Sequence, residues 1–391
     1  MNIPLSAPDI TQAEIDAVTA VLRTSRLSLG PKLEEFEHAI AQYIGVPHAV
    51  GVSSGTAGLH LCIRALNIGE DDEVIVPSFT FIAAANAILY ERATPVFVDI
   101  EPATLNLDHN QVEAAITPRT RAILVVHTFG VPANMHAILD IAARHRLLVI
   151  EDACEAIGAE FHNRRVGSFG DAAVFGFYPN KQITTGEGGM VVTRDAELAQ
   201  RIRALRNQGR YPTGDWLQHT ELGYNYRLSE ISCALGIEQL KRIESILAAR
   251  ATVAHAYNER LQNQRLILPP LELPHSRISW FVYVTRLQAE FTPDQRDAIL
   301  QSLTAQGIEC ARYFAPIHLQ PAYSAWRGAN LPITESESAR TLALPFFNRL
   351  TEDQMDRVCE VLARELHRHR PGSVTSSARE SHPVRTIRRQ K

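Results

Sequence analysis

Residues 147–193, LLVIEDACEAIGAEFHNRRVGSFGDAAVFGFYPNKQITTGEGGMVVT, contain three short apolar runs that are bounded by Gly, Asp or Asn. Such runs are typical of buried β-strands. Four more of the same kind precede them in the chain, at 48–54, 73–79, 94–100 and 121–127. Together the runs predict a sheet of seven strands.

The spacing of these runs predicts how the strands are connected. The first five lie about 20–25 residues apart, which leaves room for helical crossovers such as 55–66 and 132–145. Crossovers of this length are typical of parallel strands, and runs that are apolar throughout predict helices on both faces of the sheet. The connection at 180–189, NKQITTGEGG, has no helical pattern, so we expect one antiparallel strand there.

After residue 193 the pattern changes to helical, with segments at 197–209 and 226–262. The second segment is predicted to be one long connecting helix. Beyond it the sequence predicts strands at 278–287 and 307–314 and helices at 292–307 and 351–369. We therefore predict three regions: a large α/β domain at 1–245, a smaller C-terminal α+β domain at 246–370, and a disordered tail at 371–391. The tail is basic, because it holds five Lys or Arg residues against one acidic residue, Glu380.

Composition excludes several classes of protein. The chain has 391 residues, with 39 basic and 43 acidic side chains and a formal charge of −4, so charge gives no reason to expect nucleic acid or an acidic membrane as a partner. The first residues lack the pattern of a signal peptide, and no apolar stretch approaches the roughly 20 residues of a membrane-spanning helix. We expect a cytoplasmic protein that acts on small molecules.

The five cysteines, Cys62, Cys154, Cys233, Cys310 and Cys359, are widely scattered and form no CxxC pair. This spacing argues against a disulfide framework and against a zinc or iron–sulfur site built from cysteines. We expect no bound metal.

Polar residues at three strand ends are candidates for chemistry, because ligands of open α/β sheets bind beyond the carboxyl ends of the strands. The segment 53–58, SSGTAG, opens a predicted helix and can bind a phosphate, or it is simply a helix N-cap. Asp152 can pair with a protonated ring nitrogen or cap a loop. Lys181 can form a Schiff base or bind an anion on the surface. A phosphate site, a carboxylate and a lysine in this order are the parts of a pyridoxal phosphate (PLP) site.

The sequence resembles the DegT/DnrJ/EryC1/StrS family of sugar-nucleotide aminotransferases from about Ile3 to Leu366. The resemblance rests on a series of motifs in order: LGPKLEEFE, VSSGTAGLHL, VPSFTFIAAANAI, VFVDIEPATLNLD, VHTFGVP, EDACEAIGAE, NKQITTGEGG, LGYNYRLSEISCALGIEQL and YFAPIHLQPAY. It implies the fold type I of PLP-dependent transferases, which is aspartate aminotransferase-like, with a mostly parallel seven-stranded sheet and a smaller C-terminal α+β domain.

The resemblance also implies roles for single residues. Lys181 would carry the cofactor, Asp152 would pair with its pyridine nitrogen, and Phe81 would lie flat over its ring. The phosphate would be held by residues near the start of a helix, which are Gly55, Thr56 and Ala57. A homodimer with shared active sites is implied too, with Asn225 reaching the phosphate in the neighbouring subunit.

Two residues depart from the family pattern. Gly176 stands where a phosphate-binding Ser is common, so phosphate binding would depend more on backbone amides, Thr56 and Asn225. Glu155 stands where a Gln often contacts the phenolic oxygen of the cofactor. Because an ionised carboxylate would be repelled there, we expect Glu155 to be protonated, bound to a cation, or turned away.

The activity implied is a two-step transamination from an amino acid, usually L-glutamate, to a keto sugar linked to a nucleotide. Arg227, Tyr313 and His318 are weaker candidates for substrate contacts; alternatively Arg227 braces a dimer, Tyr313 packs, and His318 is an interior histidine. Two other functions stay open: a PLP-dependent sugar dehydratase and a non-catalytic PLP-binding regulatory protein. Lys181 argues against the dehydratases that carry His at this position.

Overall fold

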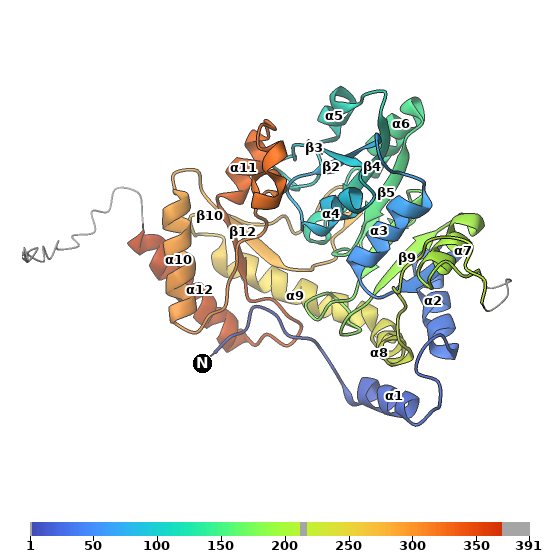
Figure 1. Cartoon of the computed structure of the whole chain (residues 1–391). Coiled ribbons are helices and arrows are strands. Elements are labelled where there is room, and N and C mark those ends of the chain that lie inside the picture. The colour runs from blue at the N-terminus through green and yellow to red at the C-terminus, as the bar shows by residue number, and fades with distance from the viewer. Residues whose placement is uncertain (1, 212–216, 370–391) are drawn as a thin grey trace, which may run out of the picture.

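The structure is a computed structural model that describes residues 2–211 and 217–369, so the predicted basic tail at 371–391 lies outside the described residues. Its centre is a seven-stranded sheet with the strand order β1-β9-β8-β5-β4-β2-β3 (Figure 1). The strands are β1 (His48–Val52), β2 (Glu73–Pro77), β3 (Thr94–Val98), β4 (Thr120–Val126), β5 (Leu148–Asp152), β8 (Ala172–Gly176) and β9 (Gly189–Thr193). Each of the seven predicted runs overlaps one of these strands.

Strand β9 is antiparallel to both of its neighbours, β8 and β1. All other neighbouring pairs in the sheet are parallel. The prediction of one antiparallel strand is therefore confirmed. The connection between β8 and β9 contains no helix, as expected for an antiparallel return of the chain.

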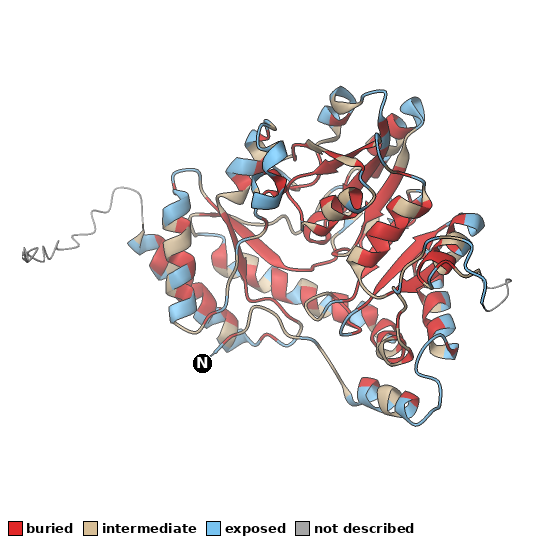
Figure 2. Ribbon diagram, in the orientation of Figure 1, coloured by how far each residue is buried: buried red, intermediate tan, exposed pale blue. Residues whose placement is uncertain are grey.

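Helices cover both faces of this sheet, and the side chains of each strand alternate between the two layers. In β4, Leu124 packs in one apolar cluster with α3, whereas Ile123 and Val125 pack in another with α6. Figure 2 shows the resulting buried sheet between half-buried helices. The helices of this part are α1 (Gln12–Leu22), α2 (Pro31–Ile44), α3 (Gly55–Ala65), α4 (Ala83–Tyr90), α5 (His109–Val112), α6 (Met135–His145), α7 (Ala196–Leu205) and α8 (Glu230–Lys241).

The predicted long connector is two helices, α8 and α9 (Ile243–Leu261), which meet at Arg242. The first part of α9 places Ile246 and Leu247 in the apolar cluster under the large sheet. Its later part places Val253 and Tyr257 in a second cluster, which belongs to the C-terminal region. Helix α9 therefore joins two hydrophobic cores, and the domain boundary at 245/246 stays a prediction.

The C-terminal region contains a small antiparallel sheet of three strands in the order β10-β12-β13. Its elements are β10 (Leu266–Ile267), β12 (Tyr283–Leu287), α10 (Pro293–Ala305), α11 (Pro332–Ser338), β13 (Thr341–Leu344) and α12 (Glu352–Arg368). The two long helices begin as the sequence predicts, because Thr292 and Thr351 each form a capping box with a glutamine three residues later. A third sheet joins β11 (Ser276–Arg277) to β6 (Glu160–Phe161) and β7 (Arg164–Arg165).

The prediction of a strand at 307–314 is wrong. This segment makes only isolated bridges, from Ile308 to Ile3 and from Ala311 to Ala343. Tyr313 and Phe314 instead face the cavity described below. The third strand of the small sheet is β13, whose four residues are too few to give a clear alternating pattern.

Candidate active site

A cavity of about 400 Å3 lies beyond the carboxyl ends of β4, β5 and β8, where the polar residues of the sequence motifs converge. Seven of the predicted site residues line it: Gly55, Thr56, Phe81, Asp152, Glu155, Lys181 and Tyr313. Its volume is in the range of small-ligand sites. Phe81 is 59% exposed, as expected for a ring that forms part of an open cavity wall.

Helix α3 points its N-terminus at this cavity. The Ser54 hydroxyl accepts a hydrogen bond of 3.0 Å from the Ala57 N–H, so the segment is an N-cap. Gly55 and Thr56 line the cavity. Ala57, which is also predicted to bind the phosphate, does not line it, and the Ala57 N–H is already bonded to the Ser54 hydroxyl. The positive end of the helix therefore presents Gly55 and Thr56 to an anion.

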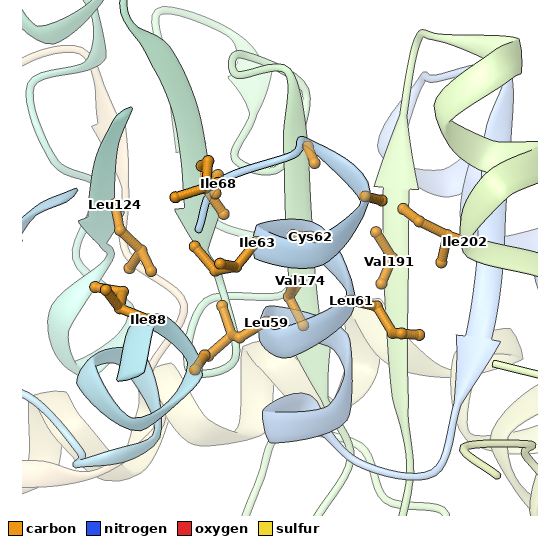
Figure 3. Packing of buried hydrophobic residues seen from close by; sticks show 14 of the residues in the cluster. Leu59, Leu61, Cys62, Ile63, Ile68, Ile88, Leu124, Val174, Val191 and Ile202 are labelled. Carbon is orange, nitrogen blue, oxygen red and sulfur yellow. The ribbon is translucent and has the colours of Figure 1, made fainter. Parts of the chain in front are cut away.

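The apolar side chains of α3 hold this N-terminus in place. In Figure 3, Leu59 and Ile63 point toward α4 and the sheet, and Leu61 lies toward Val191. All of them are buried in one cluster with Val174. Core packing thus fixes the position of the first turn of α3.

Asp152 is the last residue of β5, and its side chain is buried on the cavity wall. It accepts a hydrogen bond of 3.1 Å from the Cys154 N–H. Burial raises the pKa of Asp152, and the nearby charge of Lys181 opposes this increase. The carboxylate is therefore poised to pair with a cation that enters the cavity.

The neighbouring Glu151 points the other way, because successive side chains of a strand alternate. It is fully buried and accepts hydrogen bonds from the N–H groups of Gly167, Phe169 and Gly170 and is 3.0 Å from His127 Nε2. It does not line the cavity. Of the two adjacent carboxylates, Glu151 holds a loop and Asp152 faces the site.

Lys181 lies in the loop after β8 and extends its amine into the same cavity. Its Nζ is 3.7 Å from Glu155 Oε1 and 3.9 Å from the centre of the Phe281 ring. The side chain is only 15% exposed. An amine held between a carboxylate and an aromatic face is a fixed reactive group, unlike a lysine on the surface.

Glu155 faces the cavity and has two partners. Besides its contact with Lys181, its Oε2 accepts a hydrogen bond of 2.9 Å from the Phe129 N–H. Burial raises the pKa of Glu155, and the Lys181 charge opposes this increase. The side chain is therefore not turned away and lies beside the Lys181 amine; how it meets the cofactor stays a prediction.

We expect Glu155→Gln to change how the absorbance of the PLP-loaded protein depends on pH. A raised pKa keeps Glu155 protonated to higher pH than the usual value of about 4.3. The cofactor absorbance of the Glu155→Gln protein should therefore equal that of the wild type at low pH. The two should differ more and more as pH rises and Glu155 of the wild type ionises, which a spectrophotometric titration measures. Glu290→Gln, at an exposed carboxylate that pairs with Arg265, is the control. Identical curves for Glu155→Gln and the wild type at every pH would contradict the contact.

Tyr313 lines the cavity together with Asn180, a residue that the sequence analysis did not single out. Burial raises the pKa of Tyr313, and the neighbouring Asn180 side chain opposes this increase. The Oδ1 atom of Asn180 is buried and has no hydrogen-bond partner within the described part of the chain. Its only signal in the sequence is its place beside Lys181, in the loop after β8.

Three other predicted residues do not line the cavity. Arg227 donates a hydrogen bond of 3.1 Å to Asn207 Oδ1. His318 is fully buried, with Nδ1 2.7 Å from the Ser78 hydroxyl, so it is the interior histidine of the alternative interpretation. Asn225 is exposed on the surface.

Cys154 packs against Gly176, where the resemblance leads us to expect a serine. A Cβ atom at Gly176 would lie 3.3 Å from both Cβ and Sγ of Cys154, and one at Gly55 would lie 2.7 Å from that Sγ. The Cys154 side chain therefore occupies space next to both glycines. A serine at 176 would require this thiol to move.

Comparison with known proteins identifies relatives of the chain. GDP-perosamine synthase of Caulobacter vibrioides is 43% identical over 93% of this chain and 98% of its own length. A UDP-N-acetyl-3-dehydro-α-D-glucosamine 3-aminotransferase of Acidithiobacillus ferrooxidans is 40% identical over 90% of this chain and 94% of its own. The PLP form of Spr1654 from Streptococcus pneumoniae superimposes with a TM-score of 0.90 at 28% identity and covers 94% of this chain and 100% of that one. The sequence profile of the DegT/DnrJ/EryC1/StrS aminotransferase family matches residues 8–363, and the chain belongs to this family.

Proposed function

We propose that this protein is a PLP-dependent aminotransferase that transfers an amino group from an amino acid to a keto sugar linked to a nucleotide. The observation that carries the proposal is that the Lys181 amine and the Asp152 carboxylate, from the ends of different strands, face one cavity. Its wall also contains the start of α3 at Gly55 and Thr56. These three features match the three groups of PLP: the carboxylate suits its protonated ring nitrogen, the amine its aldehyde, and the N-terminus of α3 its phosphate.

PLP supplies an aldehyde and a ring that withdraws electrons. The protein supplies the rest. Lys181 Nζ would tether the cofactor as a nucleophile and would carry a proton as a general acid and base. Asp152 would pair with the protonated ring nitrogen, and the N–H groups at the start of α3 would bind the phosphate. Phe81, whose exposed side chain lines the cavity, would pack against the ring.

The substrate class is proposed from the relatives, whose names include a GDP-linked and a UDP-linked sugar. We propose L-glutamate as the amino donor. A cytoplasmic location is part of the proposal. Within the described residues, no helix is both long and apolar enough to cross a membrane.

The test is to add L-glutamate to the PLP-loaded protein and to follow the conversion of the cofactor to pyridoxamine phosphate by its absorbance. GDP-, UDP- and dTDP-linked sugars with a 3- or 4-keto group are then added, and the amino sugar is detected by mass spectrometry. Conversion followed by an amino sugar supports the proposal. Release of water from the sugar without amination would indicate a dehydratase, and no spectral change with any amino donor would indicate a regulatory protein.

We propose further that two copies of the chain share their active sites, with Asn225 of one subunit contributing to the phosphate site of the other. The exposed position of Asn225, away from the cavity of its own chain, supports this arrangement. We expect Lys181→Ala and Asn225→Ala proteins each to be impaired, and a mixture of the two, after subunit exchange, to regain up to about a quarter of the wild-type activity. In that mixture some dimers combine both substitutions in one site and leave the other intact. A mixture no more active than its components would contradict shared sites.

A further inference from the structure

Arg250 on α9 is a buried cation that the proposed reaction does not use. It is 2% exposed. Its Nη2 donates a hydrogen bond of 3.2 Å to the carbonyl of Lys181, and its Nη1 donates one of 3.3 Å to the carbonyl of Phe281. Its Cζ also lies 5.4 Å from the centre of the Phe346 ring, and no carboxylate within residues 2–211 and 217–369 is hydrogen-bonded to it, although a buried charge ordinarily has an ionic partner.

Burial of the charged Arg250 side chain costs free energy, and a lowered pKa is the sign of that cost. Burial lowers the pKa of Arg250 to about 10, so the guanidinium still carries its charge at neutral pH. Its partners are backbone carbonyls, which are weaker acceptors for a cation than a carboxylate is. A residue kept charged in such a place is expected to do something that an apolar side chain of similar size would not do.

The position of Arg250 in the fold indicates what that is. Ile246 and Leu247, one turn before it, pack in the core under the large sheet, and Val253 and Tyr257, after it, pack in the C-terminal core. Arg250 is therefore the point on α9 where the chain passes from one core to the other. Helix α9 runs from α8 toward α10 and α12 (Figure 1).

The two carbonyls that Arg250 holds belong to the two groups that set the position of the reactive amine. One is the backbone of Lys181 itself, and the other is that of Phe281, whose ring lies 3.9 Å from Lys181 Nζ. The next residue, Gln182, makes a second tie, because its Nε2 donates to the carbonyls of Glu155 and Ser279. The backbone that carries the Lys181 side chain is thus held by Arg250 on one side and by Gln182 on the other.

We propose that Arg250 is a positioning residue for the Lys181 amine, which it fixes between the Phe281 ring and Glu155 by binding the Lys181 and Phe281 carbonyls together. This inference rests on the proposed function, in which Lys181 carries the cofactor. Without the guanidinium fork, the amine would sample positions from which it reaches the cofactor aldehyde less often. Arg250 touches neither substrate nor cofactor, and it acts through Lys181.

The test measures how fast PLP attaches to Lys181 in cofactor-free protein. The increase in visible absorbance after addition of PLP gives the rate, and borohydride reduction followed by mass spectrometry of the Lys181 peptide identifies the attachment site. We expect Arg250→Met to lower the rate about 10- to 100-fold, as for the loss of hydrogen bonds from a charged donor. Arg250→Lys should keep the charge but rescue the rate only in part, because an ammonium does not reproduce the two-pronged geometry.

Arg296→Met is the matched control. Arg296 is also buried, lies on α10 outside the cavity, and donates a hydrogen bond of 3.0 Å to the Ser338 carbonyl. We expect this variant to lose thermal stability and to keep the wild-type rate of attachment. A slower rate in Arg250→Met with an unchanged rate in Arg296→Met supports the proposal.

The results that overturn it are distinct from those that overturn the proposed function. Attachment to Lys181 at the wild-type rate in folded Arg250→Met would overturn the positioning role. If that variant does not fold, Arg250→Lys decides: a full wild-type rate overturns the role, and a reduced rate supports it. If the wild-type protein does not attach PLP at Lys181, the proposed function itself fails, and this inference fails with it.

Discussion

Replacement of Lys181 by alanine is expected to lower the rate of the amino-donor half-reaction by about 10,000-fold, the upper range for loss of a positioned acid–base group. The methyl group of alanine can neither tether the cofactor nor carry the proton. No other lysine lines the cavity in residues 2–211 and 217–369, so no second amine is at hand to replace it. The measurement is the rate at which L-glutamate converts the absorbance of the bound cofactor, in single turnover.

Lys241→Ala is the control for this experiment. Lys241 is also a lysine near the large sheet, but its side chain on α8 is 61% exposed and pairs with Glu238. We expect this substitution to leave the half-reaction unchanged, because surface ion pairs contribute little to stability and Lys241 lies outside the cavity. A Lys181→Ala protein that retains more than about a tenth of the wild-type rate would contradict the role of Lys181, since general acid–base groups contribute at least about 100-fold.

The large sheet was predictable because its strands have a strong local signal. Residues such as Leu124 and Val125 of β4 pack on opposite faces, so both must be apolar and the whole run stands out. Strand β13 has only four residues and packs against one neighbour, β12, so its pattern is weak. The segment 307–314 resembles a strand because it contains apolar and aromatic residues, but Tyr313 and Phe314 line the cavity and do not pair in a sheet.

The parts of the site that the sequence predicted share one property: they follow directly after strands or begin a helix. Asp152 ends β5 and Lys181 follows β8, and adjacent parallel strands bring such positions together. Phe281 and Arg250 have no local signal, because they meet Lys181 from segments about 70 to 100 residues further along the chain. His318 and Arg227 could not be placed from the motifs alone, since a motif does not tell which side of the chain faces the cavity.

The pair Glu151 and Asp152 illustrates how one strand end serves both stability and function. Glu151 accepts three backbone N–H groups of the loop that includes Gly167 and Gly170. Its contact with His127, and then these N–H groups, lower its pKa against the effect of burial. In the part of the chain that the structure describes, Asp152 accepts one hydrogen bond, from the Cys154 N–H, and burial raises its pKa. The first carboxylate is satisfied by backbone donors, whereas the second keeps acceptor capacity on the cavity side.

We expect Asp152→Asn to lower the rate of the half-reaction by about 100- to 1,000-fold, which is typical when one electrostatic contact to a developing charge is removed. Asparagine has nearly the same size but no charge, so it does not hold a proton on the ring nitrogen, and the ring then withdraws electrons less strongly. The attachment of PLP to Lys181 should persist, because the amine is untouched. Single-turnover rates with L-glutamate measure the first effect, and borohydride trapping measures the second.

The stability of the cofactor-free Asp152→Asn protein gives an independent check on the physical reason. A carboxyl whose pKa is raised in the folded protein stabilises it only while protonated, and that contribution is lost as pH rises through the folded pKa. At neutral pH the substitution should therefore leave the melting temperature of the cofactor-free protein equal or higher while activity falls. Glu151→Gln should do the opposite, lowering the melting temperature because its backbone donors lose an ionised acceptor. A large loss of stability in cofactor-free Asp152→Asn would show that Asp152, like Glu151, holds the fold rather than the cofactor.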